Sequence, residues 1–193
     1  MTGARAQFAE VDEMMVRSVT YKTAIESETN LKSATYYDIT QGKGKERALI
    51  TYNYYLNTGD VKNSTVYIYE TGDYETARMT ESQTRLGTVS FTDPFSVSNE
   101  LQSTTYYYLG TREKGDEVAD YTHDYKTGKD SYYFYGTAGD AGTIGLRAQN
   151  AEVDEMMVRS VTYKSALESE TNLKSATYYD VTQGKGKERA LIT

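Results

Sequence analysis

The chain contains a long stretch of sequence that occurs twice. Residues Gly3–Thr51 return, 142 positions later, as Gly145–Thr193, and only five of the 49 aligned positions differ. A repeat of this fidelity is typical of a tandem array, in which each unit packs on its neighbours instead of enclosing a core of its own. The first constraint on the fold is therefore that one local structure must suit both copies.

A weaker period divides the repeat. Residues Leu31–Asp73 align with Leu101–Asp140 at an offset of about 70, with short deletions. We therefore predict one full period at residues 3–144, with halves of roughly four strands at 3–73 and 74–142. Residues 145–193 begin the next, nearly identical period and end within a predicted strand, as expected for a window of a longer array or for a protomer completed by a neighbour.

Composition favours strands over helices. Val, Ile, Leu and Phe make up only 32 of the 193 residues, but there are 20 tyrosines, and Tyr and Thr favour strands. A tyrosine buries on the order of 150–250 Å² while its hydroxyl stays at a wet edge. Alternation and Gly-containing turns predict the first strands at Arg17–Lys22, Lys32–Asp38, Leu49–Leu56 and Ser64–Glu70.

Less regular stretches separate these strands. Residues Gly3–Met15 predict a loop, with one helical turn as the alternative. Tyr74–Glu100 predicts a long loop with one degenerate strand, before the strand pattern returns at Leu101. Short Gly-Asp turns favour antiparallel hairpins. The predicted fold is all-β, an elongated tandem-repeat array of antiparallel hairpins that is solenoid-like or spiral-like and has no significant helix. A parallel solenoid with longer loops is the alternative.

Charge and composition argue against several partners. The net charge of −7 and the pI near 4.9 have the wrong sign for nucleic-acid or anionic-membrane binding. The chain has no cysteine and no run of 18 apolar residues, so we predict no thiolate metal site and no membrane insertion in this segment. No cofactor is expected.

A tyrosine recurs at one position of the strand motif. The fifth residue after the leading Val or Leu is Tyr in every clear copy, at Tyr21, Tyr36, Tyr106, Tyr163 and Tyr178. Such a regular position predicts packing in stacked rows along the array. An exposed aromatic platform for sugars is the sharper alternative, and oxidative tyrosine cross-linking is a third.

Serines recur as well, at Ser18, Ser33, Ser103, Ser160 and Ser175. A catalytic serine needs a base, and the only histidine, His123, has no equivalent in the other half of the repeat. We therefore predict Ser/Thr hydrogen-bonding ladders and no enzyme activity.

Three short motifs invite other readings. Gly42–Lys45 lacks the strand–loop–helix context of a phosphate-binding loop and predicts a turn. The Gly-Asp turns lack the alternating Asp residues of a calcium cage, so no metal site is predicted. Asn63 begins a glycosylation sequon, Asn-Ser-Thr.

The tyrosine-rich turns resemble a known repeat family. The segments Tyr36–Gly42, Tyr52–Asp60, Tyr67–Asp73 and Tyr133–Asp140 are similar to degenerate YD (RHS-type) repeats, which read roughly Y-x-Y-D-x-x-G, although the Arg-Leu that usually follows the glycine is missing. The sequence also resembles the Tyr/Thr-rich arrays of giant bacterial surface proteins. The resemblance implies an extracellular antiparallel β array and carries no catalytic residue.

These observations lead to one expected role and two alternatives. We expect a structural segment of an extracellular or cell-surface fibre or stalk, whose partners are neighbouring repeats or copies of itself, joined end to end. The first alternative is a surface adhesin or glycan-binding repeat array, and the second is an RHS-like shell segment.

Overall fold

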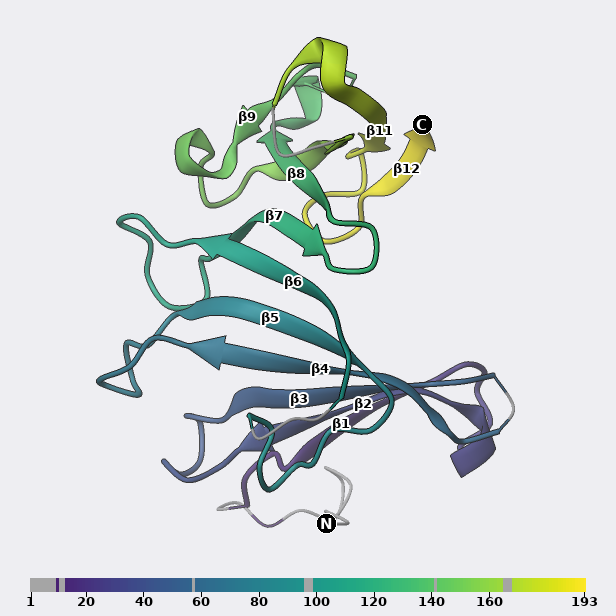
Figure 1. Ribbon diagram of the computed structural model, residues 1–193. Coiled ribbons are helices and arrows are strands. Elements are labelled where there is room, and N and C mark those ends of the chain that lie inside the picture. Colours follow the sequence, from purple (N-terminus) through teal and green to yellow (C-terminus); the bar gives the residue numbers. More distant parts are fainter. Residues whose placement is uncertain (1–9, 11–12, 57, 96–98, 141, 165–167) are drawn as a thin grey trace. The chain divides into compact units, whose positions relative to one another are not determined.

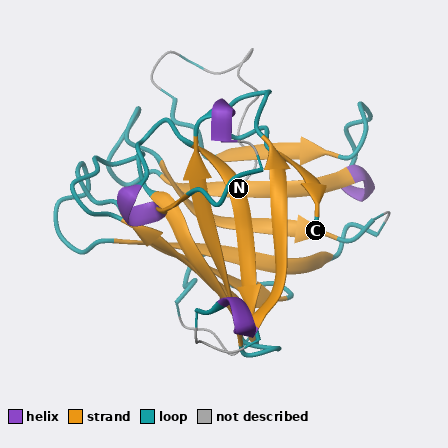
Figure 2. Cartoon of the chain, turned by 90° about the horizontal axis from the view of Figure 1, so that it is seen from above, coloured by secondary structure: helices purple, strands orange, loops and turns teal. Residues whose placement is uncertain are grey.

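Twelve β-strands form one antiparallel sheet in the computed structural model, which describes residues 10, 13–56, 58–95, 99–140, 142–164 and 168–193 (Figure 1). The strands are β1 (Arg17–Tyr21), β2 (Leu31–Asp38), β3 (Arg47–Tyr54), β4 (Val61–Tyr69), β5 (Met79–Leu86), β6 (Leu101–Tyr108), β7 (Val118–Asp124), β8 (Lys129–Gly136), β9 (Leu146–Arg147), β10 (Met156–Tyr163), β11 (Leu173–Asp180) and β12 (Arg189–Ile192). The helical elements are single 3-10 turns, η2 (Glu28–Asn30), η3 (Ala138–Asp140), η4 (Ala148–Asn150) and η5 (Glu170–Asn172), drawn purple in Figure 2.

Neighbouring strands in the sheet are also neighbours in sequence. Over the described residues the hydrogen-bonded order runs from β1 to β8 and then from β10 to β12, with β9 beside β8. Each pair whose register is described is antiparallel. The prediction of an all-β, antiparallel fold with almost no helix is confirmed.

The predicted strands agree with the structure to within three residues at their ends. The first half of the period holds β1–β4 and residues 74–142 hold β5–β8. The expected degenerate strand in Tyr74–Glu100 is the eight-residue β5. Most of Gly3–Met15 lies outside the described residues, and its described part is not helical.

The chain divides into two compact units, which are described separately. The first unit comprises Met1–Glu75 with Ser82–Gln102. Its core consists of Ile50, Tyr52, Val66 and Val89. The segment after β5 covers this core because Val89 reaches back to β3 and β4: the Tyr52 hydroxyl donates a hydrogen bond to the Val89 carbonyl (2.7 Å), and the Val89 amide donates one to the Ser64 hydroxyl (3.1 Å).

The second unit comprises Thr76–Glu81 with Ser103–Thr193. One of its clusters joins Tyr132 and Phe134 of β8 to Val161 and Tyr163 of β10. β10 belongs to the second sequence copy and β8 to the end of the first period, so the described beginning of the second copy packs its apolar side chains on the preceding period.

Alternating side chains give the sheet an aromatic face and a hydroxyl face. In the second unit Thr105, Thr122, Ser131, Thr162 and Ser175 lie opposite one another across five strands. The adjacent row, which side-chain alternation places on the other face, begins with Tyr106, Tyr121 and Tyr132. An extra residue shifts the register in most pairs, for example between Thr20 and Tyr21 in β1.

Candidate functional site

The recurring tyrosines lie at one position in β1, β2, β6, β10 and β11. Tyr163 is buried, and Tyr21, Tyr36, Tyr106 and Tyr178 are half-buried. The Tyr36 ring centroid lies 5.6 Å from that of Tyr52 and 5.5 Å from that of Phe91. These rings therefore contribute to packing between strands, although most of them keep an edge at the surface.

A continuous row of four tyrosines crosses the second unit. Ring centroids are 4.7 Å apart between Tyr106 and Tyr121, 5.5 Å between Tyr121 and Tyr132, and 5.7 Å between Tyr132 and Tyr163. The Tyr106 and Tyr121 planes are inclined by only 20°. Because these two rings stack face to face, the stacked face of each ring is closed to a sugar.

Burial raises the pKa of three tyrosines in this row, Tyr106, Tyr121 and Tyr132. Desolvation raises the pKa of Tyr132 to about 12, with the nearby Glu168 and Asp130 adding to the effect. Desolvation, followed by the contact with Tyr125, likewise raises the pKa of Tyr106 to about 12. The phenols are therefore neutral at physiological pH and act as hydrogen-bonding and packing groups.

The opposite face carries hydrogen-bonded hydroxyl groups. The Thr51 hydroxyl lies 2.7 Å from that of Thr35 and 3.1 Å from that of Tyr67. The second half of the period repeats this arrangement, since Thr122 lies 2.7 Å from both Thr105 and Tyr133. Each such row ties three strands together, and a cross-strand pair contributes about 0.2–1 kcal/mol.

The recurring serines belong to this hydroxyl face. Ser18 and Ser160 each lie 3.0 Å from a tyrosine hydroxyl of the next strand, Tyr37 and Tyr179 respectively. The other three are half-buried and face polar residues across the sheet: Ser33 lies opposite Thr20 and Asn53, Ser103 opposite Asp124, and Ser175 opposite Thr162. None of these contacts is with a histidine, so the described geometry offers these serines no general base.

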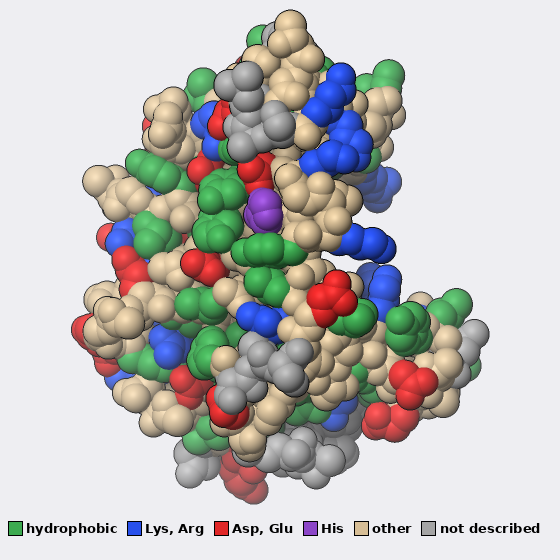
Figure 3. All heavy atoms as spheres, in the orientation of Figure 1, with side chains coloured by type: hydrophobic (Ala, Val, Ile, Leu, Met, Phe, Trp, Pro, Cys, Tyr) green, Lys and Arg blue, Asp and Glu red, His purple; other side chains and the backbone are tan. Residues whose placement is uncertain are grey.

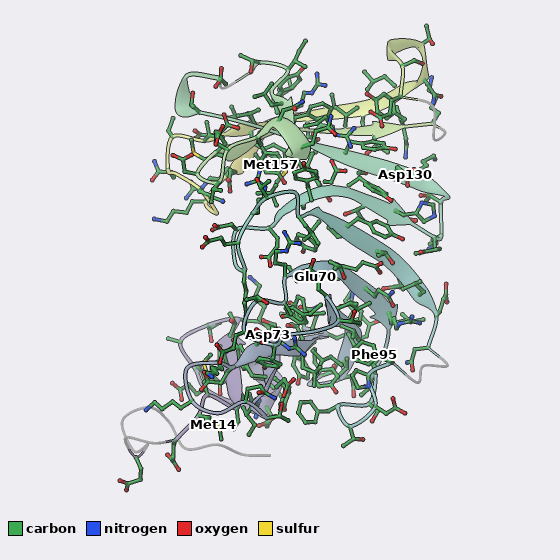
Figure 4. The ribbon with its side chains drawn as sticks, turned by 90° about the vertical axis from the view of Figure 1, so that its left-hand side faces the viewer. Met14, Glu70, Asp73, Phe95, Asp130 and Met157 are labelled. Carbon is green, nitrogen blue, oxygen red and sulfur yellow. The ribbon has the colours of Figure 1, made fainter. Side chains whose placement is uncertain are left out.

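A small polar cluster surrounds the single histidine. His123 on β7 lies opposite Asp130 on β8, and its Nδ1 is 2.6 Å from an Asp130 carboxylate oxygen. The ring of Tyr125 meets the imidazole edge-on at 4.6 Å. Figure 3 shows the histidine open to solvent on the face in view, and Figure 4 marks Asp130 on β8. This cluster combines an exposed aromatic ring with a carboxylate and an imidazole.

Arginines over aromatic rings are a feature that the sequence analysis missed. The Arg159 guanidinium lies 4.4 Å from the Phe134 ring centroid, and that of Arg47 lies 3.9 Å from the Tyr74 centroid. Arg47, and Arg17 over the Tyr36 ring, each open a strand, which is the sequence signal that could have revealed these two. A cation over a ring contributes about 0.5–2 kcal/mol, depending on how dry the site is.

Arg147 has the richest set of contacts. Its guanidinium lies 4.4 Å from the Tyr132 ring centroid and donates hydrogen bonds to Asp120 and Glu168, both at 2.8 Å. Burial alone would lower the pKa of Arg147, but the two carboxylates outweigh it and raise the pKa above its ordinary value. The side chain therefore stays charged and covers the tyrosine row.

A backbone clamp recurs three times. In each case a glutamate carboxylate accepts a hydrogen bond from the amide of a methionine near the start of a strand. The three pairs are Met15–Glu46 (3.1 Å), Met79–Glu117 (2.9 Å) and Met157–Glu188 (3.3 Å). Figure 4 marks Met157, which lies on β10.

Asn63, the sequon residue, lies within β4 rather than in a turn. Its side-chain carbonyl accepts a hydrogen bond from the Asn53 amide at 2.9 Å. Its glycosylation stays a prediction.

The described residues offer little further chemistry. Among the described residues no group of three or more His, Asp or Glu side chains could hold a metal ion. No helix in the described part of the chain is long and apolar enough to cross a membrane. Comparison with known proteins finds no family model, no curated protein and no solved structure that matches this chain.

Proposed function

We propose that this chain is a structural segment of a fibre or stalk, outside the cell or on its surface, in which neighbouring repeats are the partners. The observation that carries the proposal is the shared core of the second unit. Val161 and Tyr163 of the second copy pack on Tyr132 and Phe134 of the period before it. Units that bury their surfaces on a neighbour stack into arrays.

The recurring hydrogen bonds support the same role. The hairpin of β1 and β2 and that of β10 and β11 have the same register at every matching pair. Hydroxyl rows and glutamate clamps recur in both halves of the period. Identical joints allow a unit to be added repeatedly without a new interface, which is what an extended assembly requires.

The location outside the cell rests on the resemblance to YD-type repeats and to the arrays of bacterial surface proteins. An RHS-like shell segment would use the same joints. A shell differs from a fibre in that its repeats enclose a cavity, and images of a longer array distinguish the two.

The test is to prepare arrays with one, two and three 142-residue periods. For a fibre, small-angle scattering and negative-stain images should show the longest dimension growing by a constant increment per period at constant width. Compact particles whose diameter grows with the cube root of mass would overturn the proposal, and a closed hollow particle would favour the shell.

Glycan binding is a second candidate, and the cluster around His123 is the observation that favours it. Tyr125 is 45 % exposed and stands beside the Asp130 carboxylate and the imidazole. Carboxylates accept hydrogen bonds from sugar hydroxyls, and an exposed ring can pack on a sugar face. The tyrosine row is less suited to this role because Tyr121 is stacked between Tyr106 and Tyr132.

A glycan array followed by NMR titration tests this candidate. For any sugar that binds, Tyr125→Ala and Asp130→Asn should each weaken affinity by about tenfold or more, which corresponds to 1.4 kcal/mol. Tyr55→Ala is the matched control, because Tyr55 is equally exposed but lies far along the chain from His123. An array without hits, or an equal loss in the control, would eliminate the candidate.

A further inference from the structure

Among the strands that the structure describes, none lies on the outer edge of β1, whereas a strand does lie on the same edge of its twin, β10. Residues 16–22 and 158–164 have identical sequences. Within the described residues β1 pairs with β2 only, whereas β10 pairs with β11 on one side and with β8 on the other. The same backbone edge is therefore open in one copy and accepts a strand in the other.

Equivalent side chains of β10 and β1 differ in burial accordingly. Val158 and Val161 on β10 are 0 % and 1 % exposed, whereas the equivalent Val16 and Val19 are only half-buried. Tyr163 is buried and its equivalent Tyr21 is half-buried. Since the hairpin partner and its register are the same in both copies, the added burial comes from the surroundings of β10, where β8 packs.

β8 offers β10 a different surface on each face. Tyr132 and Phe134 form an apolar cluster with Val161 and Tyr163, and the Arg159 guanidinium lies 4.4 Å from the Phe134 ring centroid. On the other face the Ser131 and Thr162 hydroxyls are 2.8 Å apart. Every residue that β10 uses here has an identical counterpart in β1.

We propose that the outer edge of β1 is an acceptor for a strand with the sequence of β8, supplied by another copy of the 142-residue repeat. The inference rests on the proposed structural role and names the joint by which a preceding repeat is held. The register follows from that of β10: Arg17 lies opposite Phe134, Ser18 opposite Tyr133, Val19 opposite Tyr132, and Thr20 opposite Ser131.

Strand addition at this edge is selective for chemical reasons. Backbone hydrogen bonds alone would accept any extended peptide, but alternate side chains must also fit. The incoming strand must place aromatic rings over Val19 and under Arg17 while placing a hydroxyl beside Thr20. A strand with polar residues at the two aromatic positions would leave Val19 uncovered and would give Arg17 no ring beyond Tyr36 of its own hairpin, whose centroid lies 5.5 Å from the guanidinium.

The chain has no cysteine, so a single Val19→Cys substitution reports on this edge without background. In the extended protein, residues 103–144 are added directly before Gly3, which reproduces the natural junction between residues 144 and 145. We expect the extension to slow the thiol labelling of Cys at position 19 by about tenfold or more. The rate should approach that of Val161→Cys in the unextended chain.

The matched control is the same extension with Tyr132→Ser and Phe134→Ser in the added copy alone. Labelling at position 19 should then stay as fast as in the unextended chain. Equal protection by both extensions, or no protection by the unaltered one while circular dichroism shows its added strand content, would overturn the proposal. If neither extended protein folds, the peptide of residues 127–137 added to the Val19→Cys chain provides the same readout, and unchanged labelling at saturating peptide overturns the proposal.

The outcome is separable from that of the structural role. Arrays that form rods while position 19 stays accessible would refute the β1 joint and leave the fibre proposal standing. Protection at position 19 in arrays that remain compact would support the joint and refute the fibre.

Discussion

Two regions of this molecule have almost the same sequence and the same hairpin but different surroundings. Copy one, β1–β3, and copy two, β10–β12, share their register and their local bonds: Ser18–Tyr37 and Ser160–Tyr179 are both 3.0 Å apart. Equivalent side chains of the two copies differ in burial. Ile50 in β3 is 0 % exposed, and its equivalent Ile192 in β12 is 66 % exposed.

The difference shows that local sequence specifies the hairpin while the neighbouring strands decide what is buried. β3 has β4 beside it, and Val66 and Val89 complete its core. β10 has β8 beside it, and Phe134 completes a core there. Within the described residues, each copy therefore has a strand from outside its own sequence on one side only: β4 beside β3, and β8 beside β10. Taken together, the two sets of contacts are those expected of a copy that has neighbours on both sides.

The largest expected effect comes from removing Phe134, the β8 side chain that helps to bury β10. Phe134→Ala should destabilise the second unit by about 3–5 kcal/mol, because it leaves a cavity against Val161 and Tyr163. Denaturant unfolding followed by tyrosine fluorescence measures the change. The exposed Phe95 is the control, and Phe95→Ala should stay within about 0.5 kcal/mol. Equal costs would mean that β8 does not bury β10.

The second test uses equivalent positions of the two copies. Ile50→Ala should cost about 2–5 kcal/mol, because the side chain is fully buried. Ile192→Ala, the same change in the same local sequence, should cost less than about 0.5 kcal/mol because the side chain is exposed. Urea unfolding of the two variants provides the comparison, and similar losses would show that local sequence decides burial after all.

High pH should distinguish the tyrosine row from exposed tyrosines. Burial raises the pKa of Tyr132 to about 12 in the folded state, so its protonated form is favoured by folding. The unfolded state then releases its proton first, near pH 10. This contribution to stability is complete below pH 10 and falls between pH 10 and 12 by up to about 1.4 kcal/mol per pH unit.

Tyr132→Phe should make the fall of unfolding free energy with pH shallower across this window. Tyr55→Phe, which removes the hydroxyl of an exposed ring, is the control for the substitution itself. Stability measured by urea titration at several pH values provides both slopes. An unchanged slope in Tyr132→Phe would contradict the burial of this ring.

The smallest expected effect concerns the hydroxyl rows. Thr51→Val removes hydrogen bonds to Thr35 and Tyr67 and should cost about 1–2 kcal/mol. Thr193→Val makes the same change in copy two, where the hydroxyl is exposed and contacts Thr177. Its cost should be a few tenths of a kcal/mol. Thermal unfolding of both variants measures the contrast. If Thr51→Val leaves the stability unchanged, the hydroxyl rows add no stability of their own and merely follow from strand packing.

The strands were predictable where alternation and turns are clear. β2 and β4 follow from alternating side chains between Gly-containing turns, and Gly42, with a φ of +90°, adopts the backbone that such a turn requires. β5 is polar on both faces, so its sequence gave only a weak strand pattern. The two-residue β9 is too short to produce any pattern.

The candidate site was predictable in part. A tyrosine at a constant position indicated rows of rings, but the pairing of Arg159 with Phe134 depends on strands that are far apart in sequence. His123 and Asp130 are seven residues apart and meet because a hairpin joins β7 and β8. A register assigned to that hairpin would have found the pair. Burial could not be predicted, since identical stretches differ in it.

The extra residues that shift the register in many of the strand pairs have one more consequence. Strands as alike as β1 and β10 could slide by two residues and still keep each face polar or aromatic. A bulge at a fixed point, such as Thr20–Tyr21 and its counterpart Thr162–Tyr163, makes the sliding costly because the irregularity would no longer meet its match. Within each hairpin the bulge holds one register. In the proposed array, the register shift between Met157 and Arg159 would do the same where β10 meets β8, and a single allowed register would discourage the aggregation to which repetitive β sequences are prone.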